Sequence, residues 1–367
     1  MILANALLWR EDHWEAGDLA MENGVICESS CGPRLDCGGR RLMPGLVDVH
    51  THGIAGFDFG SAAAEEIGRM EEAYLHQGTT TLLATLVSLA EESYFHQAKA
   101  LLPRCGEAGP LLGIHAEGPF LAPAKKGAHN GEYLKTPDPA LAQALWQAFG
   151  GRLMRMTAAP ELPGIPELEA FAAGKFTLSL GHTACDYEQA RRALRQGFCA
   201  VTHLYNAMLP MHHRQPGPVA AALESDAWLE MICDGIHLAD GVIRMMFRGF
   251  SDRIVLISDS IAACGLGDGA YELGGLAVSV KARRATLGDG TLAGSAFSLW
   301  DCLTHCLEIG IPEELAIPAA TSHPARLLGR EDSLGTLRPG ARADILAADE
   351  NWRLRQVWKN GKSVAVF

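Results

Sequence analysis

Four histidines and two acids stand where short apolar runs of the sequence end. They are His50 and His52 in DVHTHG, Glu117 in GIHAEGPF, His182 in SLGH, His203 in VTHLYN and Asp259 in ISDS. Neutral imidazoles and carboxylates are ligands that Zn²⁺ takes in proteins, and they also suit Fe²⁺. Because alternate side chains of a strand face the same way, His50 and His52 are expected to project their rings to one side. Together the six residues predict a site for a divalent metal ion.

Each of these residues also has an ordinary structural explanation. A single histidine at the end of a strand is more often a hydrogen-bonded structural residue than a ligand, and a single carboxylate can cap a helix. That explanation must be repeated for every member of the set, whereas one metal site accounts for all of them. The cysteines offer no competing site, since Cys27, Cys31 and Cys37 lack a fourth partner and regular spacing.

The apolar runs that carry these residues alternate with segments of helical periodicity. Eight runs are expected as strands: Leu42–His50, Thr79–Val87, Pro110–Gly118, Leu153–Glu161, Phe176–His182, Ala200–Asn206, Leu229–His237 and Ile254–Ser260. Between them, segments such as 62–77, 91–105 and 186–197 have helical spacing of apolar residues. This alternation predicts an α/β fold, a (β/α)8 TIM-like barrel whose active site lies at the carboxyl ends of the strands. An open doubly wound sheet is the alternative, but the sequence has no glycine-rich phosphate loop after an early strand.

The two ends of the chain have a different pattern, with short strands broken by Gly, Asn and Asp. Residues 1–41 and 335–367 are expected to form one small β-sandwich domain, which leaves residues 42–334 for the catalytic barrel. The segment Tyr271–Gly294 is expected to be a hairpin excursion after the eighth strand, because GDG at 288–290 is a turn signal.

Composition and charge limit the classes of protein to which the chain can belong. Its 367 residues are 48% hydrophobic and 20% charged, which suits a large buried core. A net charge of −12 argues against a general binder of nucleic acid or of anionic membranes. We find no apolar stretch of about 18 residues that would span a membrane and no signal-peptide pattern at the start. Ten cysteines without a regular framework fit the reducing cytoplasm.

Longer sequence blocks resemble a known family. The segment PGLVDVHTHG, followed by an aspartate in the second half of the chain, resembles the amidohydrolase superfamily. Further blocks between about residues 43 and 344 resemble the N-acetylglucosamine-6-phosphate deacetylases within it: HAEGPFLAPAKKGAHN, LGHTACDYEQA, VTHLYNAMLPMHHRQPG, ICDGIHLADG, LISDSIAACGLGDGAYELGG and DGTLAGSAFSL. The resemblance implies a metal-dependent hydrolase that removes the acetyl group from N-acetylglucosamine 6-phosphate, giving glucosamine 6-phosphate and acetate.

The resemblance also implies roles for individual residues of this sequence. The main metal ligands would be Glu117, His182 and His203, and the catalytic acid and base would be Asp259. The sugar phosphate would be held by Asn206, Ala207 and Arg214, the substrate amide carbonyl would contact His237, and the sugar would lie near His129. Some members replace the His-x-His pair and hold one ion, whereas others keep it and can hold two. This sequence keeps His50 and His52, so a second ion is chemically possible, with Glu117 as a natural bridge. The implied metal is zinc, with iron as the alternative, at one or two ions per subunit. The loop arginine can reach a neighbouring subunit's site, which implies a homodimer.

Three other functions compete with this interpretation. A deacetylase for the galactosamine epimer shares most of the motifs, and the residues that would select the sugar's C4 hydroxyl are not evident in the sequence. A cyclic-amide hydrolase is disfavoured by the HHR cluster at 212–214 and by the KKGAHN loop. A non-catalytic assembly protein would be expected to have lost metal ligands or Asp259, and this sequence keeps them. A serine hydrolase is not indicated, because the sequence has no G-x-S-x-G elbow.

Overall fold

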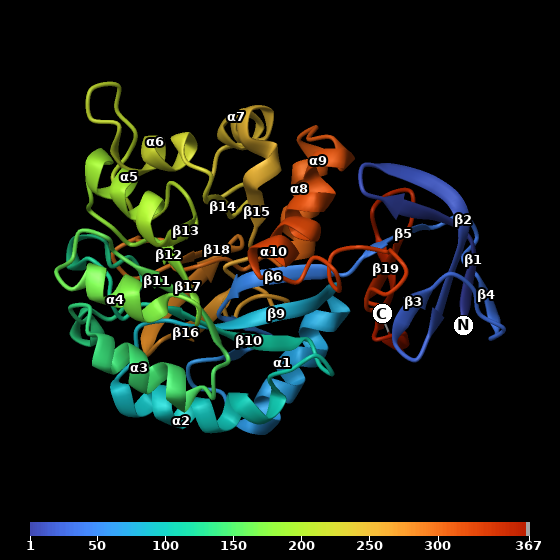
Figure 1. The fold of residues 1–367 in the computed structure, drawn as a ribbon, viewed down its shortest axis with the longest axis horizontal. Helices are drawn as coiled ribbons and strands as arrows, with labels where there is room; N and C mark the ends of the chain where they lie inside the picture. The colour runs from blue at the N-terminus through green and yellow to red at the C-terminus, as the bar shows by residue number, and fades with distance from the viewer. Residues whose placement is uncertain (365–367) are drawn as a thin grey trace.

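The apolar runs of the sequence form one parallel eight-stranded sheet in chain order, in a computed structural model that describes residues 1–364 (Figure 1). Its strands are β6(Leu46–Thr51), β9(Thr79–Leu86), β10(Leu111–Glu117), β11(Leu153–Ala158), β12(Thr177–Leu180), β13(Phe198–Val201), β14(Trp228–Met231) and β15(Ile254–Leu256). Backbone hydrogen bonds beyond β15 join the last strand to the first: Asp259 N donates to His50 O (3.0 Å) and His52 N donates to Ser260 O (2.8 Å). The predicted α/β barrel is therefore confirmed.

Helices cover the outside of this barrel (Figure 1). They are α1(Ala64–His76), α2(Glu91–Leu101), α3(Pro139–Ala148), α4(Ile165–Ala172), α5(Tyr187–Gln196), α6(Gly217–Glu224), α7(Asp240–Phe250), α8(Leu299–Glu308), α9(Glu313–Ala320) and α10(Ser322–Leu327), with short 3₁₀ turns at Leu102–Arg104, Pro123–Lys125, Gly131–Tyr133 and Ser251–Arg253. Every residue of β9 and β10 is buried, as expected for parallel strands whose two faces are both covered. None of the helices in residues 1–364 is long and apolar enough to cross a membrane.

The first expected strand, Leu42–His50, is divided between two sheets. Its beginning lies in β5(Arg41–Pro44), which pairs with terminal strands, and its end lies in β6. Gly45 separates them, and a Cβ at this position would overlap the side chain of Thr80. A glycine is required here because the chain passes from one sheet to the other at close range to β9.

Several barrel strands end earlier than the apolar runs suggested. β12, β13 and β15 stop before His182, His203 and Asp259, whose φ angles are +47°, +30° and +49°. A residue with positive φ cannot continue an extended strand. The three side chains thus lie in the first turn after their strands, at the carboxyl-end rim of the barrel, and their backbone is held in a conformation that costs free energy and is typical of functional sites.

Strands from both ends of the chain form a second sheet beside the barrel, with the N-terminal strands in blue and the C-terminal strands in red (Figure 1). Its strand order is β21-β20-β19-β5-β1-β2-β3, with β4 next to β1. The strands are β1(Ile2–Arg10), β2(His13–Glu22), β3(Val25–Cys27), β4(Arg34–Asp36), β5, β19(Ile345–Ala348), β20(Leu354–Lys359) and β21(Lys362–Val364). The prediction of a small β domain formed from both termini is confirmed. Residues 365–367, which the expected domain includes, lie outside the described residues.

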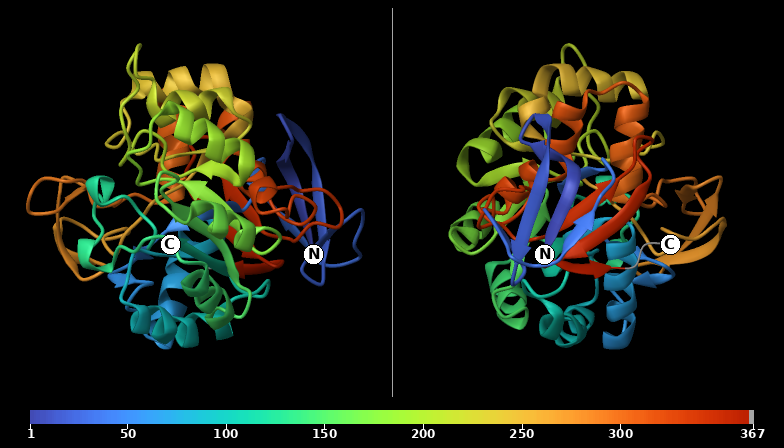
Figure 2. Two further views of the ribbon diagram at one scale, coloured as in Figure 1. Left: turned by 60° about the vertical axis from the view of Figure 1, so that its left-hand side comes forward. Right: turned by 90° about the vertical axis from the view of Figure 1, so that its right-hand side faces the viewer.

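The predicted excursion after the eighth strand forms a small antiparallel sheet. It consists of β16(Gly269–Leu273), β17(Leu276–Lys281) and β18(Arg284–Thr286), so it has one strand more than a simple hairpin. In the left view of Figure 2 this sheet, in orange, lies on the opposite side of the barrel from the terminal sheet, in blue. A short pair, β7(Gly53–Ile54) and β8(Phe57–Asp58), follows the first barrel strand.

Candidate active site

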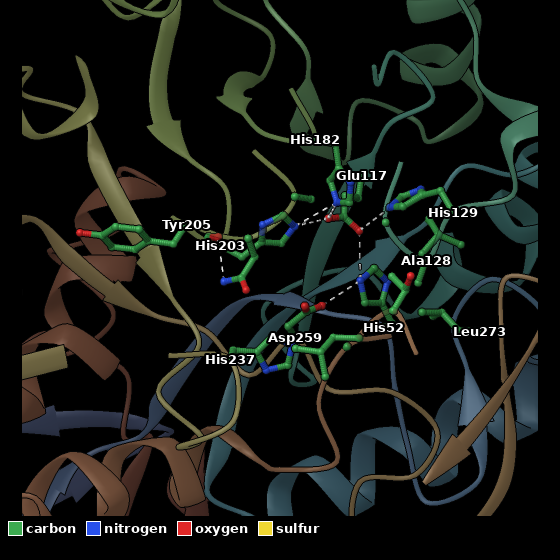
Figure 3. A pocket seen from close by; sticks show the side chains of 17 residues that line it. His52, Glu117, Ala128, His129, His182, His203, Tyr205, His237, Asp259 and Leu273 are labelled. Atoms are coloured by element: carbon green, nitrogen blue, oxygen red, sulfur yellow. Dashed lines mark hydrogen bonds and ion pairs between the residues drawn. The ribbon is translucent and has the colours of Figure 1, made fainter. Parts of the chain in front are cut away.

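A cavity of about 310 Å³ opens at the carboxyl-end rim of the barrel. Figure 3 shows the side chains that surround it, and they come from the ends of at least six different strands and from the loops that follow them. The site residues predicted from the sequence that line the cavity are His52, Glu117, His129, His182, His203, Asn206, Ala207, His237 and Asp259. His50 is fully buried and does not line it, and Arg214 lies outside it on an exposed loop.

Glu117, at the end of β10, is the centre of the site. Its Oε1 lies 2.9 Å from Nε2 of His182 and 2.9 Å from Nε2 of His203, and these two nitrogens are 3.0 Å apart. Two imidazole nitrogens and a carboxylate oxygen converge here with no polar group between them. Such a donor set fits a divalent cation, because imidazole nitrogens and a carboxylate oxygen are ligands that these ions take in proteins.

A second group lies on the other side of the Glu117 carboxylate. Oε2 of Glu117 is 3.2 Å from Nε2 of His52, and that nitrogen is 3.1 Å from Oδ1 of Asp259. Nε2 of His50 lies 3.3 Å from Nε2 of His52 and 3.5 Å from both carboxylates. The Glu117 carboxylate therefore stands between two candidate metal sites, as Figure 3 shows for the residues it labels.

The two buried acids of the site, Glu117 and Asp259, favour positive charge between them. Burial opposes a charge on His50 and His52, but Glu117 and Asp259 outweigh it, raising the pKa of His50 well above its usual value and that of His52 to about 9. Burial likewise opposes charge on Asp259, yet His50 and His52 lower its pKa to about 2. Without a metal ion the two rings thus favour their protonated forms, which carry the positive charge that a bound divalent cation would supply instead.

For each histidine, the hydrogen-bond partner of Nδ1 determines whether Nε2 can act as a metal ligand. Nδ1 of His182 lies 2.9 Å from the carbonyl oxygen of Lys125, and Nδ1 of His52 lies 3.2 Å from that of Thr85. A carbonyl only accepts, so each Nδ1 carries a hydrogen and Nε2 is the nitrogen that faces the metal site. His52 would give up its Nε2 proton when an ion binds, because a ligating imidazole is neutral.

His129 has the opposite arrangement. The backbone N–H of Ser88 donates to its Nδ1 at 3.1 Å, and burial lowers the pKa of the ring to about 4, so the ring is neutral with its hydrogen on Nε2. That Nε2 donates to Oε2 of Glu117 at 3.2 Å. His129 stands close enough to Glu117 and His182 to be counted with them as a possible ligand. Its hydrogen bonds instead make it a donor at the edge of the cavity.

Sequence reasoning missed Asp234, which holds His237. Oδ2 of Asp234 is 2.9 Å from Nδ1 of His237, and Oδ1 accepts from the backbone N–H of the same histidine, also at 2.9 Å. Burial disfavours the charged ring, but Asp234 outweighs it and raises the pKa of His237. The available signal was the three-residue spacing in DGIH, which lets a carboxylate turn back onto the histidine that follows.

The residues expected to hold the sugar phosphate are only partly brought together. The side-chain N–H of Asn206 donates to the carbonyl oxygen of His203 (3.2 Å), and Ala207 lies beside it on the cavity wall. Arg214 is exposed, and its Nη1 lies 2.6 Å from Nε2 of His213. Within one subunit, therefore, the arginine does not complete this cavity.

Comparison with known proteins identifies the family. A model of the amidohydrolase family matches residues 41–364. The chain belongs to the amidohydrolase family. This amidohydrolase is 36% identical over 386 residues to N-acetylglucosamine-6-phosphate deacetylase of Homo sapiens, an alignment that covers 99% of this chain and 93% of the human one.

Two further similarities cover nearly all of this amidohydrolase. It is 32% identical to N-acetylgalactosamine-6-phosphate deacetylase of Escherichia coli O157:H7, with 96% of this chain and 95% of the relative aligned. A solved structure of a mutant N-acetyl-D-glucosamine-6-phosphate deacetylase from Mycobacterium smegmatis, in complex with N-acetyl-D-glucosamine-6-phosphate, superimposes with a TM-score of 0.93 at 31% identity. That superposition covers 100% of this chain and 99% of the other.

Proposed function

We propose that this amidohydrolase removes the acetyl group from N-acetylglucosamine 6-phosphate, giving glucosamine 6-phosphate and acetate. The observation that carries the proposal is the convergence of five site residues on one cavity. Glu117, His182 and His203 form a ligand set. Asp259 and His237 line the same cavity, where the lowered pKa of Asp259 favours its negative charge and the raised pKa of His237 favours its positive charge. The relatives aligned over nearly the full chain support the choice of substrate.

The chain's own residues would hold one or two divalent ions, which we propose to be zinc, with iron as the alternative. Glu117, His182 and His203 would hold the first, and His50 and His52, with Glu117 and Asp259, would hold the second. When bound, such an ion lowers the pKa of a water molecule to about 7 and polarises a carbonyl group.

Asp259 is the proposed proton carrier. Positive charge beside this carboxylate lowers its pKa, so Asp259 is ionised at neutral pH and can accept the proton of the attacking water. The same carboxylic acid then gives that proton to the sugar nitrogen, so the product leaves as an amine. Without this transfer the leaving group would be an amide anion, which is a very poor one.

His237 is the proposed donor to the oxygen of the acetyl carbonyl. Its Nδ1 is already bound to Asp234, so Nε2 can donate only if both ring nitrogens carry hydrogens. The raised pKa of His237 favours this doubly protonated form. Negative charge that develops on the carbonyl oxygen would then be stabilised by a charged donor fixed in position before the reaction.

We propose that the sugar phosphate is held by Asn206, Ala207 and Arg214, with His129 next to the sugar ring. Since Arg214 lies outside the cavity of its own subunit, it would serve the cavity of a partner in a homodimer. Arginine suits this task, because its planar fork donates two hydrogen bonds to phosphate oxygens. Ten free cysteines support a reducing compartment, and we propose the cytoplasm.

We also propose that the chain divides into two domains, residues 1–41 with 335–367 and residues 42–334. The sheet formed by both ends of the chain supports this division, although β5 carries that sheet on to Pro44.

The substrate proposal is tested by offering the metal-loaded protein both epimers. N-acetylglucosamine 6-phosphate and N-acetylgalactosamine 6-phosphate should be compared by kcat/KM, with acetate and free amine measured in each reaction. We expect the glucosamine epimer to be preferred. A preference for the galactosamine epimer would instead assign the activity named for the Escherichia coli relative, which aligns over 96% of this chain.

A further inference from the structure

A buried pair of opposite charges lies in the barrel interior beneath the site. Arg155 on β11 and Glu230 on β14 are both fully buried, and Nη2 of Arg155 forms an ion pair with Oε1 of Glu230. The other carboxylate oxygen, Oε2, lies 3.3 Å from Nδ1 of His50, which is also fully buried. The three side chains form a continuous chain from the middle of the barrel to the candidate metal site.

Stability does not account for this pair. Taking an arginine and a glutamate out of water costs several kcal/mol per ion, and replacing such a pair by apolar residues is often neutral or stabilising. Furthermore, Nε and Nη1 of Arg155 have no hydrogen-bond partner among residues 1–364, and the contact between Nη2 and Oε1 of Glu230 is an ion pair without hydrogen-bond geometry. The barrel interior therefore carries a charged pair whose cost calls for a functional reason.

The partner of Nδ1 distinguishes His50 from the other candidate ligands. His52 and His182 direct Nδ1 to backbone carbonyls, those of Thr85 and Lys125, whereas His50 directs it to a carboxylate. A carboxylate acceptor fixes the hydrogen on Nδ1, fixes the ring orientation and makes Nε2 a better metal ligand. Nε2 of His50 then points at His52 and Asp259, 3.3 and 3.5 Å away.

We propose that Glu230 is a positioning residue, held by Arg155, which orients His50 so that this chain binds a second divalent ion beside Glu117. The inference deepens the proposed function, since it concerns the same site, but it is tested by metal binding without any substrate. Glu230 touches neither the cavity nor the reacting atoms, so its effect passes entirely through the ring of His50.

The test is the number and affinity of zinc ions bound per chain, measured by equilibrium dialysis against buffered zinc with elemental analysis. The variant Arg155→Met combined with Glu230→Leu removes both charges at once and leaves no unpaired buried ion. We expect the wild type to bind two ions. In the variant the first ion should bind as before and the second about 10–100-fold more weakly, the usual cost of losing such an outer partner. The melting temperature, measured alongside, reports any merely structural effect.

Asp48→Asn is the matched control. Asp48 is another buried carboxylate of the same interior, but it accepts from the backbone N–H of His50 (3.3 Å) and from the Ser258 hydroxyl rather than from the ring. Its removal should leave the affinity for the second ion unchanged. Equal weakening in the control and in the Arg155/Glu230 variant would overturn the specific role of Glu230.

A measurement on the wild type keeps the inference testable if the variant does not fold. In zinc-loaded protein with ¹⁵N-labelled histidine, His50 should carry its hydrogen on Nδ1 and its metal on Nε2, with the signal assigned by His50→Gln. The opposite tautomer, a wild type that binds one ion only, or a folded variant with unchanged affinity for the second ion would each overturn the inference. None of these results would contradict the proposed deacetylation, because that activity is measured separately with substrate.

Discussion

Oδ2 of Asp234 lies 2.9 Å from Nδ1 of His237 and also accepts a hydrogen bond from the Ser295 hydroxyl at 2.8 Å. The carboxylate is therefore fixed from two sides, and the histidine ring is fixed by it. Because Asp234 raises the pKa of His237, this contact sets the pH range in which the ring carries hydrogens on both nitrogens.

The first prediction concerns the alkaline limb of the pH profile. Charged His237 is present below its raised pKa and is lost as the pH rises through it, so kcat should fall on the alkaline side. Asp234→Asn removes the charge that raises this pKa, so the fall should move to lower pH. The measurement is kcat between about pH 5 and pH 10 for the two proteins, with metal content checked at each pH. An alkaline limb at the same pH in both would mean that His237 does not set it.

The second prediction concerns Asp259. The substitution Asp259→Asn keeps the size of the side chain but cannot accept the proton of water, so kcat should fall by about 10²–10⁴-fold, the usual scale of general acid–base catalysis. The first metal ion should still bind, and KM should change little, since the lost interaction belongs to the transition state. Steady-state kinetics on protein of known metal content make the test. Near-normal kcat in this variant would assign the proton transfer to another group, such as His237.

The third prediction separates metal ligands from neighbouring donors. Glu117→Gln should lose most bound metal and nearly all activity, because the carboxylate stands between both ligand groups. The matched variant His129→Gln removes a ring that also contacts Glu117, but only as a donor through Nε2, and it should keep its metal. The measurement is the metal content of the two folded variants, determined by elemental analysis. A Glu117→Gln protein with wild-type metal content would contradict the ligand assignment, and loss of metal in His129→Gln would make His129 a ligand.

The fourth prediction concerns Arg214 and the proposed dimer. Arg214→Ala should raise KM for the phosphorylated sugar far more than for the unphosphorylated one. If the arginine serves the partner's cavity, mixing Arg214→Ala chains with Asp259→Asn chains should recover activity. In the mixed dimer one cavity has both an intact Asp259 and the partner subunit's Arg214. Absence of any recovery after the subunits have exchanged would rule out action across the interface.

The fold and much of the site follow from the sequence because both depend on periodic patterns. Strand and helix alternation gives the barrel, and residues at the ends of strands must meet at one rim. The ends of the strands were less predictable. His182, His203 and Asp259 adopt positive φ angles that tertiary contacts impose, and none of the three is a glycine, the residue type that would have indicated such a conformation.

The outer residues of the site were missed for a different reason. Asp234, Glu230 and Arg155 act through other side chains, across 3 to 180 residues of sequence, and a single sequence does not report such contacts. A signal was nonetheless present for two of them. Arg155 in LMRMTA and Glu230 in WLEM are charged residues within apolar strands, and a buried charge almost always has a partner.

Metal-dependent release of acetate from N-acetylglucosamine 6-phosphate tests the central claim most directly. Protein stripped by a chelator, verified as metal-free by elemental analysis, should release no acetate, and activity should return in proportion to the zinc it rebinds, with one glucosamine 6-phosphate formed per acetate. Full activity in the metal-free protein would contradict the account. So would a zinc-loaded, folded protein that releases no acetate from either epimer.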